Sequence, residues 1–400
     1  MTPTNTKRNT RHRVLTRRGV LWLGQTCNLR CRFCYFIDRI RARDHEEHPF
    51  MSLDKAKKIC STLADTYGNR AIDIQGGEPT IYPDIHRLVR HCRDIGLMPT
   101  LITNVLVLSR KEECERLRDA GIRDLLISVH GLGDIYDHIS GVPNSHKKQM
   151  AALGNLHKTG IPFRFNCVLA KSILPGLTDV ARLAIDSGAR AMNFIAFNPF
   201  EDQQKMGRSI EDVPSYREVS VPLVKSLDLL IAAGLECNVR YYPLCMVDTN
   251  YRKYLYNFQQ LPYDLHEWDY ASWSWSGQRS QRMRNGGLGP VVTLREANTW
   301  SRLFNDKDAY MTADISVEDE YRHSAFIRAQ EHCVYQYASG CDTCSLKRIC
   351  DGFHGDYASM FSVDEVKPVG LGRDINDPLY YIREQEKIVE VEDWDWAMKG

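Results

Sequence analysis

The sequence predicts an α/β protein whose core is a sheet of parallel strands. Two features of the 400-residue chain support this fold class. Short apolar runs of strand length alternate with amphipathic segments of helical period, and most of these segments end at a glycine. Because each helix carries the chain back across the sheet before the next strand begins, successive strands point in the same direction. The periodicity does not decide whether the sheet is open or curved into a barrel.

Six apolar runs suit buried strands. They occupy residues 19–25, 71–77, 98–104, 124–131, 162–169 and 191–198. The amphipathic segments predict helices over residues 53–68, 84–96, 110–121, 147–160 and 177–188, and a longer helix over 214–234. Ser109 and Glu112 stand three residues apart at the start of the third helix, which is the pattern of a capping box.

Composition and charge exclude some classes of partner. The chain carries 52 Lys and Arg against 51 Asp and Glu, so we expect neither a nucleic-acid nor a membrane partner. No apolar run is long enough to cross a bilayer. Residues 1–18 are basic and polar, and we expect a disordered tail rather than an export signal. Thirteen cysteines in such a chain indicate thiols and metal ligands in a reducing cytoplasm.

Three cysteines follow the first predicted strand at the spacing C-x3-C-x2-C. They are Cys27, Cys31 and Cys34, and Tyr35 comes next. A structural zinc site or an ordinary iron–sulfur cluster takes four protein ligands. Three cysteines can bind three irons of a cubane cluster, which leaves the fourth iron open to a small chelating ligand. A zinc knuckle or three core cysteines are the alternatives.

This stretch resembles the signature of radical S-adenosylmethionine (SAM) enzymes, and the βα alternation over residues 19–200 is similar to their partial (βα)6 barrel. The resemblance implies that Cys27, Cys31 and Cys34 hold a [4Fe–4S] cluster and that SAM chelates its open iron. An electron from the reduced cluster would then cleave SAM to methionine and a 5′-deoxyadenosyl radical. The resemblance also implies an external low-potential electron donor of the flavodoxin or ferredoxin type.

Polar and glycine residues stand where the predicted strands end. Such carboxyl ends converge on one rim of a parallel sheet or barrel, where sites are built. Gly76, Gly77 and Glu78 match the family's GGEP stretch near the SAM amino group, and Asn104 corresponds to a polar residue near the ribose, although the chain reads TNV and not TNG. The rim candidates for contact with SAM or substrate are Ser128, His130, Asn166 and Asn193, and each has an ordinary hydrogen-bonded strand end as its alternative. Tyr35, which follows the third cysteine of the signature, is a further candidate for binding the cofactor.

A second set of cysteines reads C-x2-C-x5-C at Cys341, Cys344 and Cys350. Zinc or an iron–sulfur cluster suits this spacing. The region is similar to part of the SPASM or twitch extension of radical SAM enzymes, which implies one auxiliary [4Fe–4S] cluster. We favour Cys245 as its fourth ligand because this residue ends a rigid element beside the barrel. Cys333 is the alternative, and coordination by substrate is a third possibility.

Two other cysteines, Cys167 and Cys237, are candidates for a catalytic role. A thiol near the rim can return a hydrogen atom to a substrate radical, which would make the protein an epimerase. The alternative is that both are buried core thiols. Residues 261–300 combine tryptophans with charged side chains, which suits a lid over a sugar, cyclitol or nucleoside, or the packing of the extension on the barrel.

We therefore expect a tail at residues 1–18, a barrel over 19–235, an auxiliary-cluster domain over 236–365 with the insert 261–300, and a C-terminal tail over 366–400 that packs on the barrel. The expected function is a radical SAM oxidoreductase that oxidises or epimerises a small polar substrate. We expect a small substrate because only about eighteen residues precede the first strand. Modification of a ribosomally made peptide is the alternative, and an iron–sulfur electron carrier or a zinc-stabilised interaction protein is a non-enzymatic one.

Overall fold

A single parallel sheet dominates the computed structural model, which describes residues 18–34, 37–43, 48–65, 71–197, 210–257, 260, 274–275, 334–378 and 380–382. Within these residues the sheet has nine strands in the order β8-β7-β6-β5-β4-β3-β2-β1-β9, and every neighbouring pair is parallel. The strands are β1 (Arg18–Trp22), β2 (Ala71–Gln75), β3 (Met98–Thr103), β4 (Asp124–Ser128), β5 (Phe163–Leu169), β6 (Ala191–Ala196), β7 (Glu236–Arg240), β8 (Leu255–Tyr256) and β9 (Ser274–Trp275).

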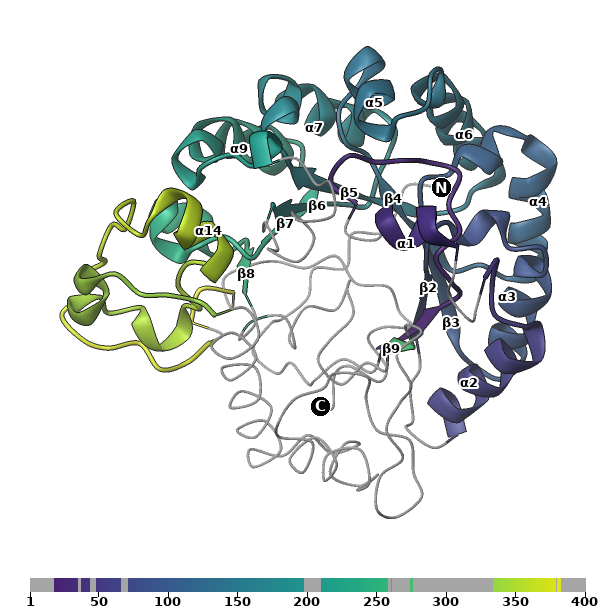
Figure 1. Cartoon of the computed structure of the whole chain (residues 1–400), viewed down its shortest axis with the longest axis horizontal. Coiled ribbons are helices and arrows are strands. Elements are labelled where there is room, and N and C mark those ends of the chain that lie inside the picture. Colours follow the sequence, from purple (N-terminus) through teal and green to yellow (C-terminus); the bar gives the residue numbers. More distant parts are fainter. Residues whose placement is uncertain are drawn as a thin grey trace.

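The sheet is an arc with helices along its convex side (Figure 1). In the described residues its two outermost strands, β8 and β9, do not pair with each other, so the barrel is partial. The helices of this part of the chain are α1 (Ile37–Ala42), α2 (Leu53–Asp65), α3 (Ile85–Asp94), α4 (Lys111–Ala120), α5 (Gly133–Ser140), α6 (Ser145–Thr159), α7 (Leu177–Asp186), α9 (Tyr216–Ala232) and α10 (Thr249–Arg252).

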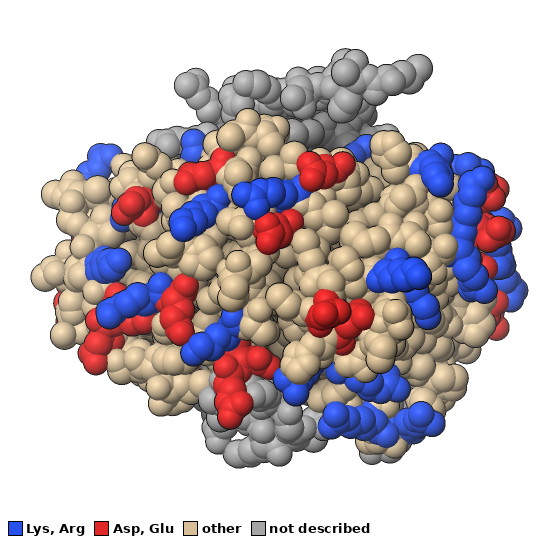
Figure 2. Space-filling view, turned by 90° about the horizontal axis from the view of Figure 1, so that it is seen from above, with Lys and Arg blue, Asp and Glu red and all other residues tan. Residues whose placement is uncertain are grey.

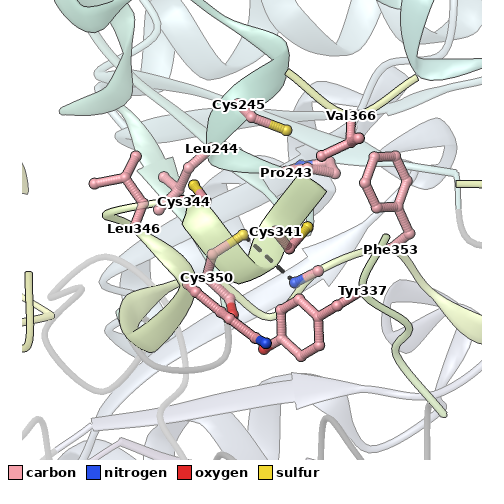
Figure 3. Close-up of a pocket in the computed structure, with 12 residues that line it drawn as sticks. Pro243, Leu244, Cys245, Tyr337, Cys341, Cys344, Leu346, Cys350, Phe353 and Val366 are labelled. Atoms are coloured by element: carbon pink, nitrogen blue, oxygen red, sulfur yellow. Dashed lines mark hydrogen bonds between the residues drawn. The ribbon is translucent and has the colours of Figure 1, made fainter. Parts of the chain in front are cut away.

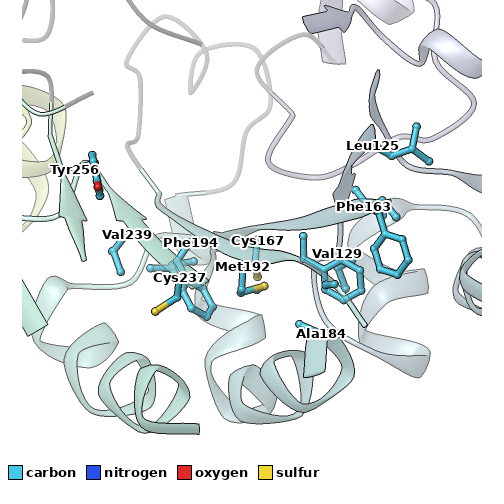
Figure 4. Close-up of a cluster of buried hydrophobic side chains, with 14 of the residues drawn as sticks. Leu125, Val129, Phe163, Cys167, Ala184, Met192, Phe194, Cys237, Val239 and Tyr256 are labelled. Carbon is cyan, nitrogen blue, oxygen red and sulfur yellow. The ribbon is translucent and has the colours of Figure 1, made fainter. Parts of the chain in front are cut away.

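The core lies between the sheet and these helices. Side chains alternate along each strand, so one set faces the helices and the other faces the inside of the arc. Phe163 and Cys167 of β5 and Met192 and Phe194 of β6 point toward the helices (Figure 4) and are fully or almost fully buried. The strands predicted from the sequence are therefore present in the structure. Alternate residues along each strand face either the helices or the inside of the arc.

The structure contains a strand and a helix that add to the predicted elements. Strand β7 pairs with β6 in parallel, so the sheet continues beyond residue 235, where we had placed the end of the barrel. Helix α5 was not predicted, because its eight residues, GDIYDHIS, include a glycine, two aspartates and a β-branched pair that lower helix propensity.

The predicted capping box before α4 is wrong. Ser109 is the last residue of a 3-10 helix (Leu106–Ser109), and its hydroxyl donates to the carbonyl oxygen of Leu106 instead of capping α4. A capping box does begin α9, where Ser215 and Glu218 bond reciprocally. The S-x-x-E spacing alone does not distinguish these two cases.

The C-terminal residues form a smaller unit beside α9 and β8 (Figure 1). It contains two 3-10 helices, Ser339–Thr343 and Lys347–Ile349, and helix α14 (Gly355–Phe361). The Tyr357 ring stacks on that of Tyr216 with centroids 3.8 Å apart, and the Tyr357 hydroxyl accepts from the Tyr216 backbone N–H (2.7 Å). This contact joins the unit to the first turn of α9.

The outer surface carries charges of both signs. Figure 2 shows Lys and Arg side chains lying among Asp and Glu side chains over one face of the molecule. Exposed pairs such as Arg182–Asp179 and Lys171–Glu218 contribute to this mixture. Among the described residues there is no helix with the length and apolar character needed to cross a membrane.

A buried ion pair lies on the inner side of the sheet. Arg164 Nε donates to Asp124 Oδ2 (2.9 Å), and both residues are almost fully buried. The hydroxyl of Thr100 also donates to this carboxylate. The pair joins β4 to β5 below the rim.

We expect Asp124→Ala to lower the free energy of unfolding by about 3–5 kcal/mol, because it leaves the Arg164 guanidinium buried without its partner. Urea denaturation followed by circular dichroism measures this change. Asp119→Ala is the matched control, since Asp119 pairs with Arg118 on the surface, and it should cost less than about 0.5 kcal/mol. Equal losses in both variants would contradict the prediction.

Candidate functional site

The loop with Cys27, Cys31 and Cys34 follows β1 and lies against the end of α5. The backbone N–H groups of Arg30 and Arg32 donate to the carbonyl oxygens of Ser140 (2.8 Å) and Ile139 (3.0 Å). Gly141 follows at φ 67°, and a Cβ there would lie 2.9 Å from the Arg30 carbonyl oxygen. A glycine at the end of α5 therefore lets the cysteine loop reach the helix.

Gly76 and Gly77 bring the end of β2 against the same loop. The Gly77 N–H donates to the Gly24 carbonyl oxygen (2.8 Å), and the Glu78 N–H donates to that of Thr26 (2.9 Å). A Cβ on Gly77 would lie 2.1 Å from the Thr26 oxygen, and one on Gly76 would lie 2.5 Å from the Gly24 oxygen. In this structure, the space left by the two absent side chains is occupied by the cysteine loop.

Glu78 is a buried carboxylate that joins β2 to β3. Its Oε1 accepts from the N–H of Thr80 (2.9 Å) and the hydroxyls of Thr80 and Thr103 (2.5 Å each), and its Oε2 accepts from the Asn104 N–H (2.7 Å). Burial raises the pKa of Glu78, and the four hydrogen bonds oppose this shift. The side chain is thus engaged by the protein.

Asn104 is also engaged by the protein. Its Nδ2 donates to Asn28 Oδ1 in the cysteine loop (2.8 Å), and its Oδ1 accepts from the Leu106 N–H (3.1 Å). The resemblance implies a polar residue near the SAM ribose here, and in this structure the amide lies between β3 and the cysteine loop. Asn28 was not singled out from the sequence, because its partner is 76 residues away.

The three thiols of the loop affect one another. Burial raises the pKa of Cys27 to about 12, and the Glu78 carboxylate and Cys34 add to the rise. Burial, Cys34 and Cys27 also raise the pKa of Cys31. The Leu29 N–H donates to the Cys27 sulfur (3.4 Å), which favours the thiolate. The loop thus brings its three thiols together near a buried carboxylate.

His130 supports the loop by packing. Its ring meets that of Phe33 edge to face, with centroids 4.6 Å apart. Burial lowers the pKa of His130 to about 3, so the ring is neutral at neutral pH, and its Nδ1 accepts from the Val168 N–H (3.2 Å). The ring therefore connects the cysteine loop to β5.

Ser128, Asn166 and Asn193 lie at one level on neighbouring strands. Ser128 is the register partner of Asn166, and Asn166 is that of Asn193. Asn193 Oδ1 accepts from Asn238 Nδ2 on β7 (3.1 Å), a continuation of this row that we did not predict. Asn166 Oδ1 is buried without a hydrogen-bond partner in the described part of the chain, as are both polar side-chain atoms of Gln25 just before Cys27. Buried amide atoms usually have partners, so these suit contact with a ligand.

Cys167 and Cys237 are both fully buried in the core between the sheet and the helices (Figure 4). Burial alone raises the pKa of Cys167. This location favours the alternative that they are core thiols, because it offers neither sulfur a route to a radical inside the arc.

Four cysteines gather in a second place. Cys245 lies in a 3-10 helix (Leu244–Met246) after β7, and it lines a pocket together with Cys341, Cys344 and Cys350. All four sulfur atoms point into this pocket (Figure 3), whose space is roughly 350 Å³ with the solvent at its mouth included. Within the described residues, no three His, Cys, Asp or Glu side chains are close enough to share a single metal ion.

Backbone N–H groups surround these sulfur atoms. Gly352 donates to Cys350 and Val369 donates to Cys344, both at 3.4 Å. Burial and the neighbouring Cys245 raise the pKa of Cys350, while the N–H groups of Gly352 and Leu244 lower it. Val369 belongs to the segment after residue 365, so this part of the expected C-terminal tail packs on the cysteine loop and not only on the barrel.

Some predicted residues lie outside the described part of the chain. They are residues 1–17 of the expected N-terminal tail, Tyr35, Cys333, most of the insert 261–300 and residues 383–400.

Comparison with known proteins identifies the family. Residues 23–185 match the family model of the radical SAM superfamily. These residues form a radical SAM domain. The matched segment begins directly after β1 and contains the cysteine loop, so the prediction of a radical SAM protein with a partial barrel is confirmed.

Curated relatives match up to half of the chain. An AdoMet-dependent heme synthase of Oleidesulfovibrio alaskensis is 27% identical over 207 residues, which are 50% of this chain and 51% of the relative. A PqqA peptide cyclase of Bradyrhizobium diazoefficiens is 30% identical over 171 residues, which are 42% of this chain and 43% of the relative. The chain spans about half the length of the curated relatives it matches.

Solved structures resemble more of the chain. Streptococcus suis SuiB bound to precursor peptide SuiA has a TM-score of 0.55 and 15% identity, with 90% of this chain and 76% of SuiB covered. Native anSMEcpe with bound AdoMet and Kp18Cys peptide has a TM-score of 0.52 and 16% identity, with 95% and 96% covered. At these identities the likeness shows the fold alone.

We expect Gly77→Ala to weaken iron retention by the cysteine loop and to lower the free energy of unfolding by about 1–3 kcal/mol, because its Cβ would overlap the Thr26 carbonyl. Iron analysis after anaerobic reconstitution and urea denaturation measure the two effects. Gly154→Ala in α6 is the control, since a Cβ there meets no atom within 4 Å, and it should change stability by no more than about 1 kcal/mol. Unchanged iron retention in Gly77→Ala would contradict the prediction.

Proposed function

We propose that the protein is a SAM-cleaving radical enzyme with one auxiliary iron–sulfur cluster. The observation that carries the proposal is the pairing of a three-cysteine loop at the strand ends of a radical SAM domain with a separate pocket of four cysteines. Three ligands suit a cluster that binds SAM, and four suit a cluster that is closed to substrate.

The residues around the first loop fit a [4Fe–4S] cluster. The three thiols are soft donors, and the Leu29 N–H reaches the Cys27 sulfur. Burial raises the pKa values of Cys27 and Cys31, so binding of an iron cluster would release the protons of these thiols. The buried, unpartnered amide atoms of Gln25 and Asn166 are candidates for contact with SAM or substrate.

When bound, the cluster would supply the electron that cleaves SAM to methionine and a 5′-deoxyadenosyl radical, and this radical would abstract a hydrogen atom from the substrate. The chain's own residues position the loop and shape its surroundings. Gly76 and Gly77 let the loop approach β2, and the neutral His130 ring packs on Phe33. Ser128, Asn166 and Asn193 offer hydrogen-bonding groups along one level of the inner face.

The second pocket fits an auxiliary cluster of the SPASM or twitch kind. Cys245, Cys341, Cys344 and Cys350 provide four sulfur ligands, and backbone N–H groups donate to two of them. A cluster with four protein ligands has no open iron, so we assign it to electron transfer and not to substrate binding. It would accept or relay the electron that the substrate radical loses when it is oxidised.

Peptide modification is the second candidate for the substrate class. It is favoured by the PqqA peptide cyclase relative and by the similarly folded SuiB, which was solved with a precursor peptide. The small polar substrate that we expected rests on the short segment before the first strand and on the aromatic insert, and residues 1–17 and most of the insert lie outside the described residues. Both classes are therefore included in the assay below.

We expect the anaerobically reconstituted and reduced protein to convert SAM to 5′-deoxyadenosine, which chromatography with mass spectrometry detects. Cys31→Ala should abolish this product, because it removes a ligand of the first cluster. Cys114→Ala, in a buried helix position away from both cysteine groups, should retain it. Bound zinc with no cleavage of SAM would contradict the proposal.

The same assay distinguishes the substrate classes. Candidate peptides are compared with a panel of sugars, cyclitols and nucleosides, in deuterated water. Stimulated SAM cleavage identifies the class, deuterium in the product indicates epimerisation or reduction, and a loss of two hydrogens indicates dehydrogenation.

We expect the wild-type protein to bind about eight irons per chain and Cys245→Ala to retain about four, because loss of one ligand releases the auxiliary cluster. Iron analysis and the visible absorption spectrum measure the difference. Cys333→Ala is the matched control and should keep the full iron content. If Cys333→Ala loses the iron instead, the fourth ligand is Cys333 and the assignment of Cys245 is wrong.

A further inference from the structure

The hydrogen bond between Asn104 and Asn28 joins the end of β3 to the cysteine loop. Asn28 lies directly after Cys27, and its Oδ1 accepts from Asn104 Nδ2 (2.8 Å). The same oxygen lies 3.9 Å from the Cys27 sulfur. Asn28 therefore lies beside a sulfur atom that is a candidate cluster ligand, and the hydrogen bond from Asn104 holds Asn28 in this position.

The remaining groups of Asn104 are held in place by the protein. The backbone N–H donates to Glu78 Oε2 (2.7 Å), and the side-chain Oδ1 accepts from the Leu106 N–H (3.1 Å). The residue is 6% exposed. Turning its amide toward a ligand would break the bond to Asn28 and leave buried polar groups without partners, which is costly.

Glu78 anchors the other end of this connection. Besides Asn104, its carboxylate accepts from Thr103 and from Thr80, so it fixes the ends of β2 and β3 relative to each other. A continuous path of hydrogen bonds thus runs from Glu78 through Asn104 to Asn28. Such paths of buried polar groups hold one geometry when every member is satisfied.

We propose that Asn104 is a positioning residue for the cluster-binding loop, which it holds through Asn28, and that it is not a contact of the SAM ribose. This inference rests on the proposed function, in which Cys27, Cys31 and Cys34 bind the first cluster. Groups that orient metal ligands from behind typically change metal affinity by roughly 10- to 100-fold when they are removed.

The test compares Asn104→Ala, Asn28→Ala and the double variant after anaerobic reconstitution. We expect each single change to weaken retention of the first cluster against a chelator by roughly 10- to 100-fold, and to alter the electron paramagnetic resonance signal of the reduced cluster measured without SAM. The double variant should lose no more than the worse single variant, because both changes remove one connection. Asn104→Asp, which keeps the size of the side chain and loses the N–H donor, should behave like Asn104→Ala.

Asn155→Ala is the matched control. The Asn155 amide also ties down the segment after β3, because it donates to the carbonyl oxygens of Leu108 (3.0 Å) and Ser109 (2.9 Å). These contacts do not involve the cysteine loop. The control should therefore leave both the cluster retention and the spectrum at their wild-type values, whatever it does to stability.

Three results would overturn the inference. Wild-type cluster retention in Asn104→Ala, with weakened SAM binding, would make Asn104 a cofactor contact. Wild-type behaviour of Asn28→Ala would show that the effect does not pass through Asn28. A wild-type protein that binds no cluster would overturn the proposed function itself, and the inference with it.

Discussion

The close approach of residues 24–27 to residues 76–78 is the constraint on which the rest of the site depends. Two backbones can lie this near only where side chains are absent, and Gly76 and Gly77 meet that condition. Once the loop is seated, the Glu78 N–H is bonded to Thr26 and its carboxylate reaches β3. The position of Cys27 is thus determined jointly by the ends of three neighbouring strands.

The second group of cysteines depends on the sheet in a different way. Cys245 follows β7, whose pairing with β6 fixes its place, whereas Cys341, Cys344 and Cys350 come from the C-terminal unit. The stacked rings of Tyr216 and Tyr357 hold that unit against α9. The four cysteines can therefore meet only if the C-terminal unit docks on the barrel. This pocket thus depends on tertiary packing and not on a local motif alone.

Much of this arrangement was predictable from the sequence, and most of what was missed has one cause. Strands β1 to β6 and most of the helices between them, though not α1 or α5, follow from local periodicity, and Cys245 was chosen because it ends a rigid element beside the sheet. What sequence reasoning missed depends on distant partners: the bond of Asn28 to Asn104, the approach of Gly141 to Arg30, and the register of Asn238 with Asn193. The capping box predicted at Ser109 is wrong for a local reason, because the nearby carbonyl oxygen of Leu106 accepts from its hydroxyl.

Val105 shows how far the hydrogen-bond path from Glu78 shapes the backbone. It has φ 59° and ψ 8°, a left-handed conformation that costs a β-branched residue about 1–2 kcal/mol. A glycine, as in the common TNG pattern, would avoid this cost. Here the valine side chain is fully buried, and its N–H donates to the Thr103 hydroxyl (2.9 Å) that itself donates to Glu78. The burial of the side chain and this hydrogen bond offset the strain, so the turn after β3 keeps the conformation that presents Asn104 to the cysteine loop.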